Sequence, residues 1–133
     1  KELEDLRPFL KGNYKFFENI PQSKIYELMF ESDMALTAAG NTLYELAFFG
    51  VPSIIICHHE RHNRVAQKFY EQGASINLGI GAEVDEDSIG KAAESLMSNL
   101  QKRKELFRNA RLIVDGNGTG RLADRIAKDI GTT

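Results

Sequence analysis

The sequence predicts an α/β fold, a Rossmann-like open parallel sheet with helices on both faces. Short apolar runs alternate with amphipathic stretches in the order β-α-β-α-β-α-β, and further helices follow. The run "SIIIC" at 53–57 is continuous and β-branched, which is typical of a strand covered on both faces. Strands joined through helices in this way run parallel and are connected by right-handed crossovers.

The first third of the chain is predicted to hold two helices and two strands. Residues 1–10 are typical of the end of a helix, and the aromatic-rich residues 14–19 are typical of a short strand. Apolar side chains at helical spacing predict a helix over 23–30, with Ser23 as its cap. The second strand is expected at 34–37.

The middle of the chain continues the alternation. A helix is expected at 42–49, and Gly50 follows its last turn as a stop signal. The strand at 53–57 comes next, and then a helix at 63–72 and a strand at 75–79.

The last third of the chain is predicted to be helical. One helical stripe of apolar residues begins after Asp85 and consists of Ile89, Ala92, Ala93, Leu96, Met97 and Leu100. A charged helix is expected over about 101–113. A final helix carries a second apolar stripe, made of Leu122, Ala123, Ile126, Ala127 and Ile130.

Length and composition favour a single domain over residues 1–133. Hydrophobic residues make up 42% and charged residues 27% of the chain, as in ordinary globular proteins.

The net charge of −2, with basic residues scattered, argues against a nucleic-acid partner. No apolar run is long enough for a membrane span, and the start lacks a signal-peptide pattern, so we expect a cytoplasmic location. The single cysteine, Cys57, excludes an internal disulfide and is expected to be a buried, inert thiol.

The turn between the strand at 34–37 and the next helix is the first candidate site. Small residues at 38–40 leave the backbone uncovered, so amide hydrogens and the positive end of the helix dipole can approach an anion such as a diphosphate. Thr42 can donate its hydroxyl to a phosphate oxygen, and Glu45, one turn further, can accept hydrogen bonds from a vicinal diol such as a ribose.

A structural alternative exists for this turn. Thr42 and Glu45 have the spacing of a helix capping box, in which both side chains only satisfy the first-turn amides. The spacing alone does not separate the two interpretations. Neither GxGxxG nor GxxxxGK[ST] is present, so the sequence predicts no dinucleotide cofactor and no Walker loop, and we expect no cofactor.

The polar loop at 58–64 is the second candidate site. His59 and His62 are one residue too close together for the HExxH zinc motif, so we expect no metal. We interpret His62 and Asn63 as hydrogen-bonding groups for a sugar or phosphate, with Arg61 or Arg64 supplying charge. The alternative is a solvated loop in which Asn63 caps the following helix. The carboxylates at 83–87 are expected to form a solvated loop with a helix cap.

The stretch "SDMALTAAGNTLYELAFFGVPSIII" at 32–56 resembles the carboxyl-terminal, nucleotide-binding half of GT-B nucleotide-sugar enzymes. Within that group the chain is most similar to the spore-coat polysaccharide biosynthesis proteins and the UDP-sugar hydrolase of the pseudaminic acid pathway. The lipid II N-acetylglucosaminyltransferase is a more distant member. The segments "GAS" at 73–75 and "DGNGTGRLADRIA" at 115–127 extend the resemblance to about residues 14–130.

The resemblance implies a role for each candidate residue. The turn that holds the UDP diphosphate consists of Ala39, Gly40, Asn41 and Thr42, and Glu45 takes the ribose hydroxyls. The contacts to the sugar or phosphate come from His59, Glu60, Arg61, His62 and Asn63. Relatives commonly have Glu-Asn-Gln where this chain has Glu60-Arg61-His62.

The resemblance also implies that the chain is a fragment. The first strand of this half and the catalytic groups of the other half are missing, so we expect a UDP-sugar site without turnover, and an N-terminal domain as partner. The implied function is the UDP-sugar-binding half of a glycosyltransferase-like enzyme or nucleotide-sugar hydrolase in surface or spore-coat polysaccharide biosynthesis. The alternative is a non-catalytic module that docks on a separate acceptor-binding subunit, for which an exposed Phe48-Phe49 pair would provide a face.

Overall fold

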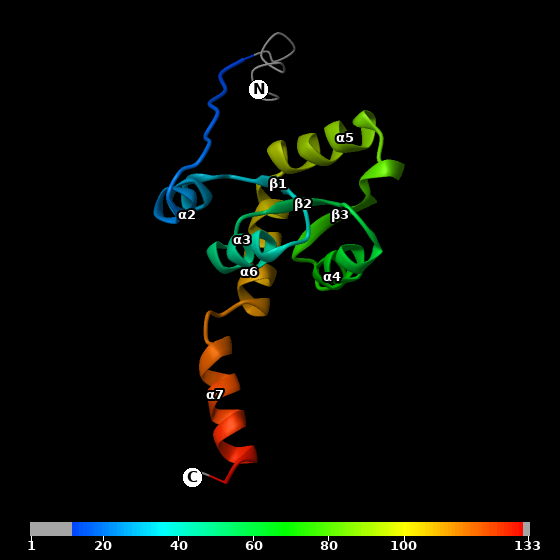
Figure 1. Ribbon diagram of the computed structural model, residues 1–133. Coiled ribbons are helices and arrows are strands. Elements are labelled where there is room, and N and C mark those ends of the chain that lie inside the picture. The colour runs from blue at the N-terminus through cyan, green and yellow to red at the C-terminus, as the bar shows by residue number, and fades with distance from the viewer. Residues whose placement is uncertain (1–11, 132–133) are drawn as a thin grey trace.

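The chain forms three parallel strands surrounded by helices in the computed structural model, which describes residues 12–131 (Figure 1). In chain order the elements are α2 (Gln22–Glu31), β1 (Ala35–Thr37), α3 (Asn41–Phe49), β2 (Ser53–Cys57), α4 (Glu60–Glu71), β3 (Ser75–Ile80), the 3-10 turn η2 (Gly81–Glu83), α5 (Glu86–Met97), α6 (Leu100–Ile113) and α7 (Gly118–Asp129). The α/β class and the open parallel sheet with helices around it are confirmed.

The sheet has the strand order β1-β2-β3, with β2 in the centre. Leu36 of β1 is level with Ile54 of β2, and Ile54 is level with Ile76 of β3. The β2–β3 register shifts between Ile55 and Cys57, as at a β-bulge. The central strand is buried along nearly its whole length, as its β-branched sequence predicts.

The two faces of β2 point into two apolar clusters. Ile55 is fully buried on the side of α3 and α4, where it packs with Leu43 and Phe69 among others. Ile54 faces α5 and α6, where Leu96 and Leu106 cover it. The alternation along one strand therefore places helices on both sides of the sheet.

The prediction of a strand at 14–19 is wrong. Residues 14–18 have no regular secondary structure, and the sheet of the described residues has three strands instead of four. An extended segment becomes a strand only beside a free strand edge. Figure 1 shows this segment leading away from the sheet, and β1 has no strand neighbour on its outer side among residues 12–131. The helix end predicted at 1–10 lies outside the described residues.

Two other local expectations need correction, and a third is confirmed. Pro21, not Ser23, occupies the N-cap of α2, and no side chain caps that helix. The apolar stripe after Asp85 does not continue through Leu100, because α5 ends at Met97 and α6 begins at Leu100. Met97 and Leu100 are both exposed. Asp85 does cap α5, as expected for the carboxylates at 83–87, since its Oδ1 accepts a 2.7 Å hydrogen bond from the amide of Ser88.

The last helix, α7, projects away from the rest of the molecule beyond the end of α6 (Figure 1). Its amphipathic sequence forms a helix as predicted, yet its apolar stripe is exposed at Leu122, Ile126 and Ile130. None of the residues of α7 is buried. The stripe therefore faces solvent in the part of the chain that the structure describes.

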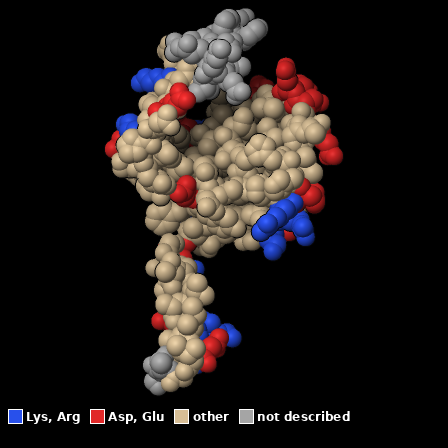
Figure 2. Space-filling view, viewed as in Figure 1, with Lys and Arg blue, Asp and Glu red and all other residues tan. Residues whose placement is uncertain are grey.

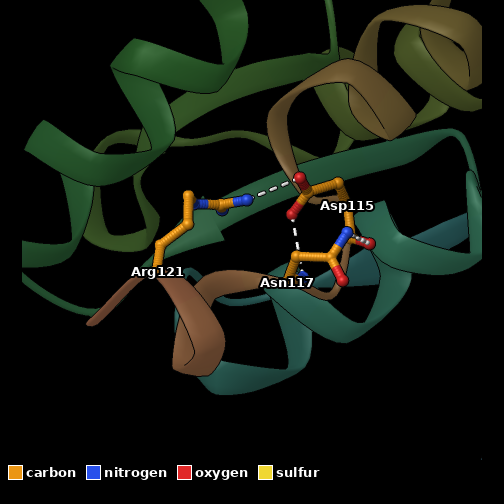
Figure 3. Close-up of polar contacts among 3 residues, drawn as sticks. All are labelled: Asp115, Asn117 and Arg121. Carbon is orange, nitrogen blue, oxygen red and sulfur yellow. Dashed lines mark hydrogen bonds and ion pairs between the residues drawn. The ribbon is translucent and has the colours of Figure 1, made fainter. Parts of the chain in front are cut away.

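The junction between α6 and α7 is held by a polar clamp (Figure 3). Asp115 accepts a 2.9 Å hydrogen bond from the amide of Asn117. Its Oδ2 atom also forms an ion pair with Nη1 of Arg121, at a distance of 2.6 Å. These contacts lower the pKa of Asp115 from 3.8 to about 2, and the hydrogen bond from the Arg121 guanidinium is the largest cause. The next residue, Gly116, has φ +79° and lies close against the ring of Phe48.

Candidate functional site

The two predicted site segments lie at the same edge of the sheet. α3 begins shortly after β1 ends, and α4 begins shortly after β2 ends. Because β1 and β2 are neighbouring parallel strands, both helices start at the carboxyl edge of the sheet. The two helices also touch further along, where the rings of Tyr44 and Phe69 are 5.5 Å apart and nearly perpendicular.

The start of α3 has no side-chain cap. Gly40 occupies the N-cap position, and its own amide donates to the carbonyl of Ala38 at 3.0 Å. The amide of Leu43 already bonds to the carbonyl of Gly40 at 3.1 Å. The amides of Asn41 and Thr42 donate to no group within residues 12–131. The capping-box interpretation is therefore wrong, and these two amides are free to meet an anion.

The space above this turn is open. A Cβ atom built on Gly40 would meet no heavy atom within 4 Å. Asn41 and Thr42 are exposed, whereas Ala39 is buried beneath them. Cys57, at the end of β2, is also buried, and burial raises the pKa of its thiol, so Cys57 is the inert core thiol that the sequence predicts.

Glu45 lies one turn further along α3 and is half-buried. Its Oε1 atom accepts a 3.0 Å hydrogen bond from Gln22 Nε2 and a 3.2 Å hydrogen bond from the hydroxyl of Tyr26. Both partners come from α2. They are functional candidates that sequence reasoning missed. Beside Glu45 lies an apolar pocket of about 410 Å³, lined by Tyr26, Tyr44, Glu45, Phe48, Phe49, Val114 and Gly116.

The second site segment is not a loop. Glu60, Arg61, His62 and Asn63 form the first turn of α4, which begins three residues before the predicted start at 63. His59 occupies the N-cap, and no side chain caps the helix. The expected cap Asn63 lies inside the helix, so that alternative is wrong.

Asn63 instead links α4 to the third strand. Its Oδ1 accepts a 3.0 Å hydrogen bond from Asn77 Nδ2, and its Nδ2 donates to Glu60 Oε2 at 3.4 Å. Asn77 also accepts a hydrogen bond from the amide of Gly79. Asn77 is a further residue that sequence reasoning missed; its only signal was a polar side chain between the apolar Ile76 and Leu78 of β3. This amide pair holds the start of α4 at the sheet edge.

Two of the three histidines of this segment, His59 and His62, stack on each other. The rings of His59 and His62 are 4.0 Å apart between centroids and tilted by 38°. Nδ1 of His62 is buried and has no hydrogen-bond partner in the described part of the chain. Burial first, and then the neighbouring His59, His58 and Arg61, lower the pKa of His62 below 6.5.

This shift makes the stability of the fold depend on pH. The unfolded chain binds a proton at His62 more readily than the folded chain, so stability is expected to fall as the pH drops below about 6.5. His62→Gln should reduce this loss between about pH 7.5 and 5.5, measured by urea denaturation at each pH. The exposed His58→Gln is the comparison variant: because burial of His62 is the larger cause of the shift and His58 a lesser one, this variant should keep most of the pH dependence. An unchanged pH dependence in His62→Gln would contradict the assignment.

The charges around the site are unevenly distributed. Figure 2 shows Lys and Arg side chains gathered over α4, which carries Arg61, Arg64 and Lys68. Between this basic group and most of the acidic residues lies a broad surface over the sheet and α3 with few charged side chains (Figure 2). Arg61 and Arg64 lie near the uncapped start of α4, where Glu60 is the acidic residue of the first turn, and this positive charge favours an anionic ligand. Within residues 12–131 no group of three or more His, Cys, Asp or Glu side chains is placed to hold a metal ion.

The Phe48-Phe49 pair is divided between core and surface. Phe49 packs with the cluster of Met29, Leu46 and Val51. Phe48 is 39% exposed, and the guanidinium of Arg111 lies 5.7 Å from the centre of its ring. Phe48 of the pair is therefore exposed and Phe49 is half-buried, so the docking face that the alternative function predicts consists of Phe48 alone.

No helix among residues 12–131 has the length and apolar character that a membrane crossing requires.

The chain is a distant homologue of the spore coat polysaccharide biosynthesis protein SpsG of Bacillus subtilis (strain 168), with 33% identity over 108 residues. The aligned region covers 76% of this chain and 32% of SpsG, so the chain spans about a third of the length of that relative. No protein-family model matches the chain. No solved structure matches it significantly. The predicted relation to spore-coat polysaccharide biosynthesis proteins is confirmed, and the relation to GT-B and lipid II enzymes stays a prediction.

Proposed function

We propose that this chain is the UDP-sugar-binding part of an enzyme of polysaccharide biosynthesis, either a glycosyltransferase-like enzyme or a nucleotide-sugar hydrolase. The similarity to SpsG supports the polysaccharide role and a sugar-related enzyme family. The observation that carries the nucleotide site is the pair of unpaired amides, of Asn41 and Thr42, at the uncapped start of α3. The catalytic groups belong to an N-terminal domain in this proposal.

The diphosphate lies against the start of α3. The amides of Asn41 and Thr42 and the Thr42 hydroxyl donate to its oxygens, and the helix dipole adds favourable potential. Gly40 leaves room above the turn. The same donors stabilise UDP as it leaves the sugar, whether the acceptor is water or another sugar.

The ribose and the sugar lie on either side of the diphosphate. Glu45 accepts hydrogen bonds from the ribose hydroxyls, because its carboxylate is one helical turn from the phosphate turn. The start of α4 brings His59, Glu60, Arg61, His62 and Asn63 to the same sheet edge. In this arrangement Arg61 supplies charge to the phosphate, and His62 and Asn63 bind the sugar or phosphate.

Titration with UDP tests this function. We expect amide chemical-shift changes at 39–45, and Glu45→Ala is expected to weaken UDP binding by about tenfold, since hydrogen bonds to a charged group are lost. Glu94→Ala on α5 removes an exposed carboxylate on a different helix and should leave binding unchanged. If millimolar UDP moves no amide at 39–45, the nucleotide site is refuted.

One observation favours a second candidate, a module that docks on a separate acceptor-binding subunit. The apolar stripe of α7 is exposed at Leu122, Ile126 and Ile130 on a helix that projects from the molecule (Figure 1). An exposed amphipathic helix of this kind fits a hydrophobic groove on another protein surface. If the chain binds no UDP, the docking module is favoured over the UDP-sugar-binding function.

A further inference from the structure

We propose that Tyr26 and Gln22 of α2 are positioning residues that orient the Glu45 carboxylate toward the vicinal hydroxyls of a bound nucleotide. This inference rests on the proposed function and deepens it. It names the residues that give the site its preference for a ribose over a sugar that lacks both hydroxyls.

The three side chains form a closed hydrogen-bonded triangle. Gln22 Nε2 lies 2.9 Å from the Tyr26 hydroxyl and 3.0 Å from Glu45 Oε1, and the Tyr26 hydroxyl lies 3.2 Å from the same Oε1. Both donors thus hold one oxygen of the carboxylate. No donor among residues 12–131 bonds to the other oxygen, Oε2. The arrangement fixes the position of one carboxylate oxygen and leaves the other for a ligand.

The packing of α2 on α3 makes this triangle a fixed feature. Met29 of α2 is buried against Leu46 and Val51, which anchors the helix. The ring of Tyr26 lies 5.6 Å from the ring of Phe49, which holds the hydroxyl in place. Gln22 is one helical turn before Tyr26 and therefore lies on the same face of α2.

The chemistry of the two donors suits this role. An amide and a phenol are neutral, so they orient the carboxylate without cancelling its charge. No Lys or Arg within the described residues forms an ion pair with Glu45. The free oxygen therefore remains a strong acceptor, and hydrogen bonds from hydroxyls to a carboxylate are stronger than bonds between neutral groups. A carboxylate held in one orientation loses less entropy when a diol binds.

The test compares UDP with 2′,3′-dideoxyuridine diphosphate on the full 133-residue chain. Tyr26→Phe keeps the ring that packs on Phe49 and removes only the hydroxyl. It is expected to weaken UDP binding by about three- to tenfold and to leave the affinity for the dideoxy nucleotide unchanged. In a Glu45→Ala background, Tyr26→Phe should have no further effect on UDP binding.

Two further variants complete the experiment. Gln22→Ala, near the exposed start of α2, should show the same selective loss and provides a second test of the triangle. Tyr70→Phe, an exposed tyrosine on α4, is the matched control and should change neither affinity. The amide spectrum of each variant, compared with that of the unchanged chain, is the check that the variant is folded.

The outcomes separate this inference from the proposed function. If the chain binds neither nucleotide, the proposed function is refuted, and the positioning role is refuted with it. If the chain binds UDP but Tyr26→Phe weakens both nucleotides equally, Tyr26 is only structural and the inference is overturned. Unchanged UDP binding in both Tyr26→Phe and Gln22→Ala would also overturn it, while the proposed function would stand.

Discussion

Replacing Ile55 by alanine is expected to lower the free energy of unfolding by about 2–5 kcal/mol. Ile55 is 0% exposed and lies in the middle of the central strand, where α3 and α4 cover it. The shorter side chain leaves a cavity among close-packed neighbours, and the rigid sheet around it relaxes only in part. Urea denaturation followed by circular dichroism measures the loss.

The neighbouring residue in the same strand is the matched control. Ile56 is half-buried, so Ile56→Ala is expected to cost clearly less than Ile55→Ala. Equal losses in the two variants would show that the side chain of Ile55 is no more tightly packed than that of Ile56. A loss below about 1 kcal/mol for Ile55→Ala would contradict the burial described here.

Gly50→Ala is expected to destabilise the chain by about 2–4 kcal/mol. Gly50 ends α3 with φ +75°, a left-handed conformation that alanine adopts only with strain. A Cβ atom at this position would also lie 2.6 Å from Cε2 of Phe107, whose ring belongs to α6. Both effects act against the contact between α3 and α6, and the thermal unfolding temperature should fall accordingly.

A second glycine in the chain gives the opposite expectation. Gly90 is in the interior of α5, and a Cβ atom there would meet nothing within 4 Å. Gly90→Ala should therefore raise stability by up to about 1 kcal/mol, because alanine favours a helix interior more than glycine does. If Gly50→Ala lowers stability no more than Gly90→Ala does, the described position of the Phe107 ring close to the end of α3 is contradicted.

Local sequence signals predicted the elements that depend on local physics. The strand at 53–57 was predicted to the residue, since its β-branched run fits only a covered strand. Gly50 predicted the end of α3 for the same kind of reason. The strand at 14–19 failed because a strand depends on a partner edge that its own residues do not encode.

The candidate site shows the same division. The turn at 38–42 was recognised from small residues after a strand, whereas the choice between free and capped amides needed the backbone geometry. The polar residues at 60–63 were expected in a loop because their side chains lack an apolar period. They begin a helix, since the carbonyl of His59 accepts the amides of His62 and Asn63. Contacts between α2 and Glu45 join residues 19 and 23 positions apart, and no local pattern reveals them.

The clamp around Asp115 has a consequence for any surface that covers α7. Because the pKa of Asp115 is about 2, its carboxylate remains charged in mildly acidic surroundings, and the bond to Arg121 persists there. These contacts restrain the junction between α6 and α7, so a partner that buries Leu122 and Ile126 has less conformational freedom to remove there. Association through this helix should accordingly have a smaller entropic penalty than docking of a freely jointed tail.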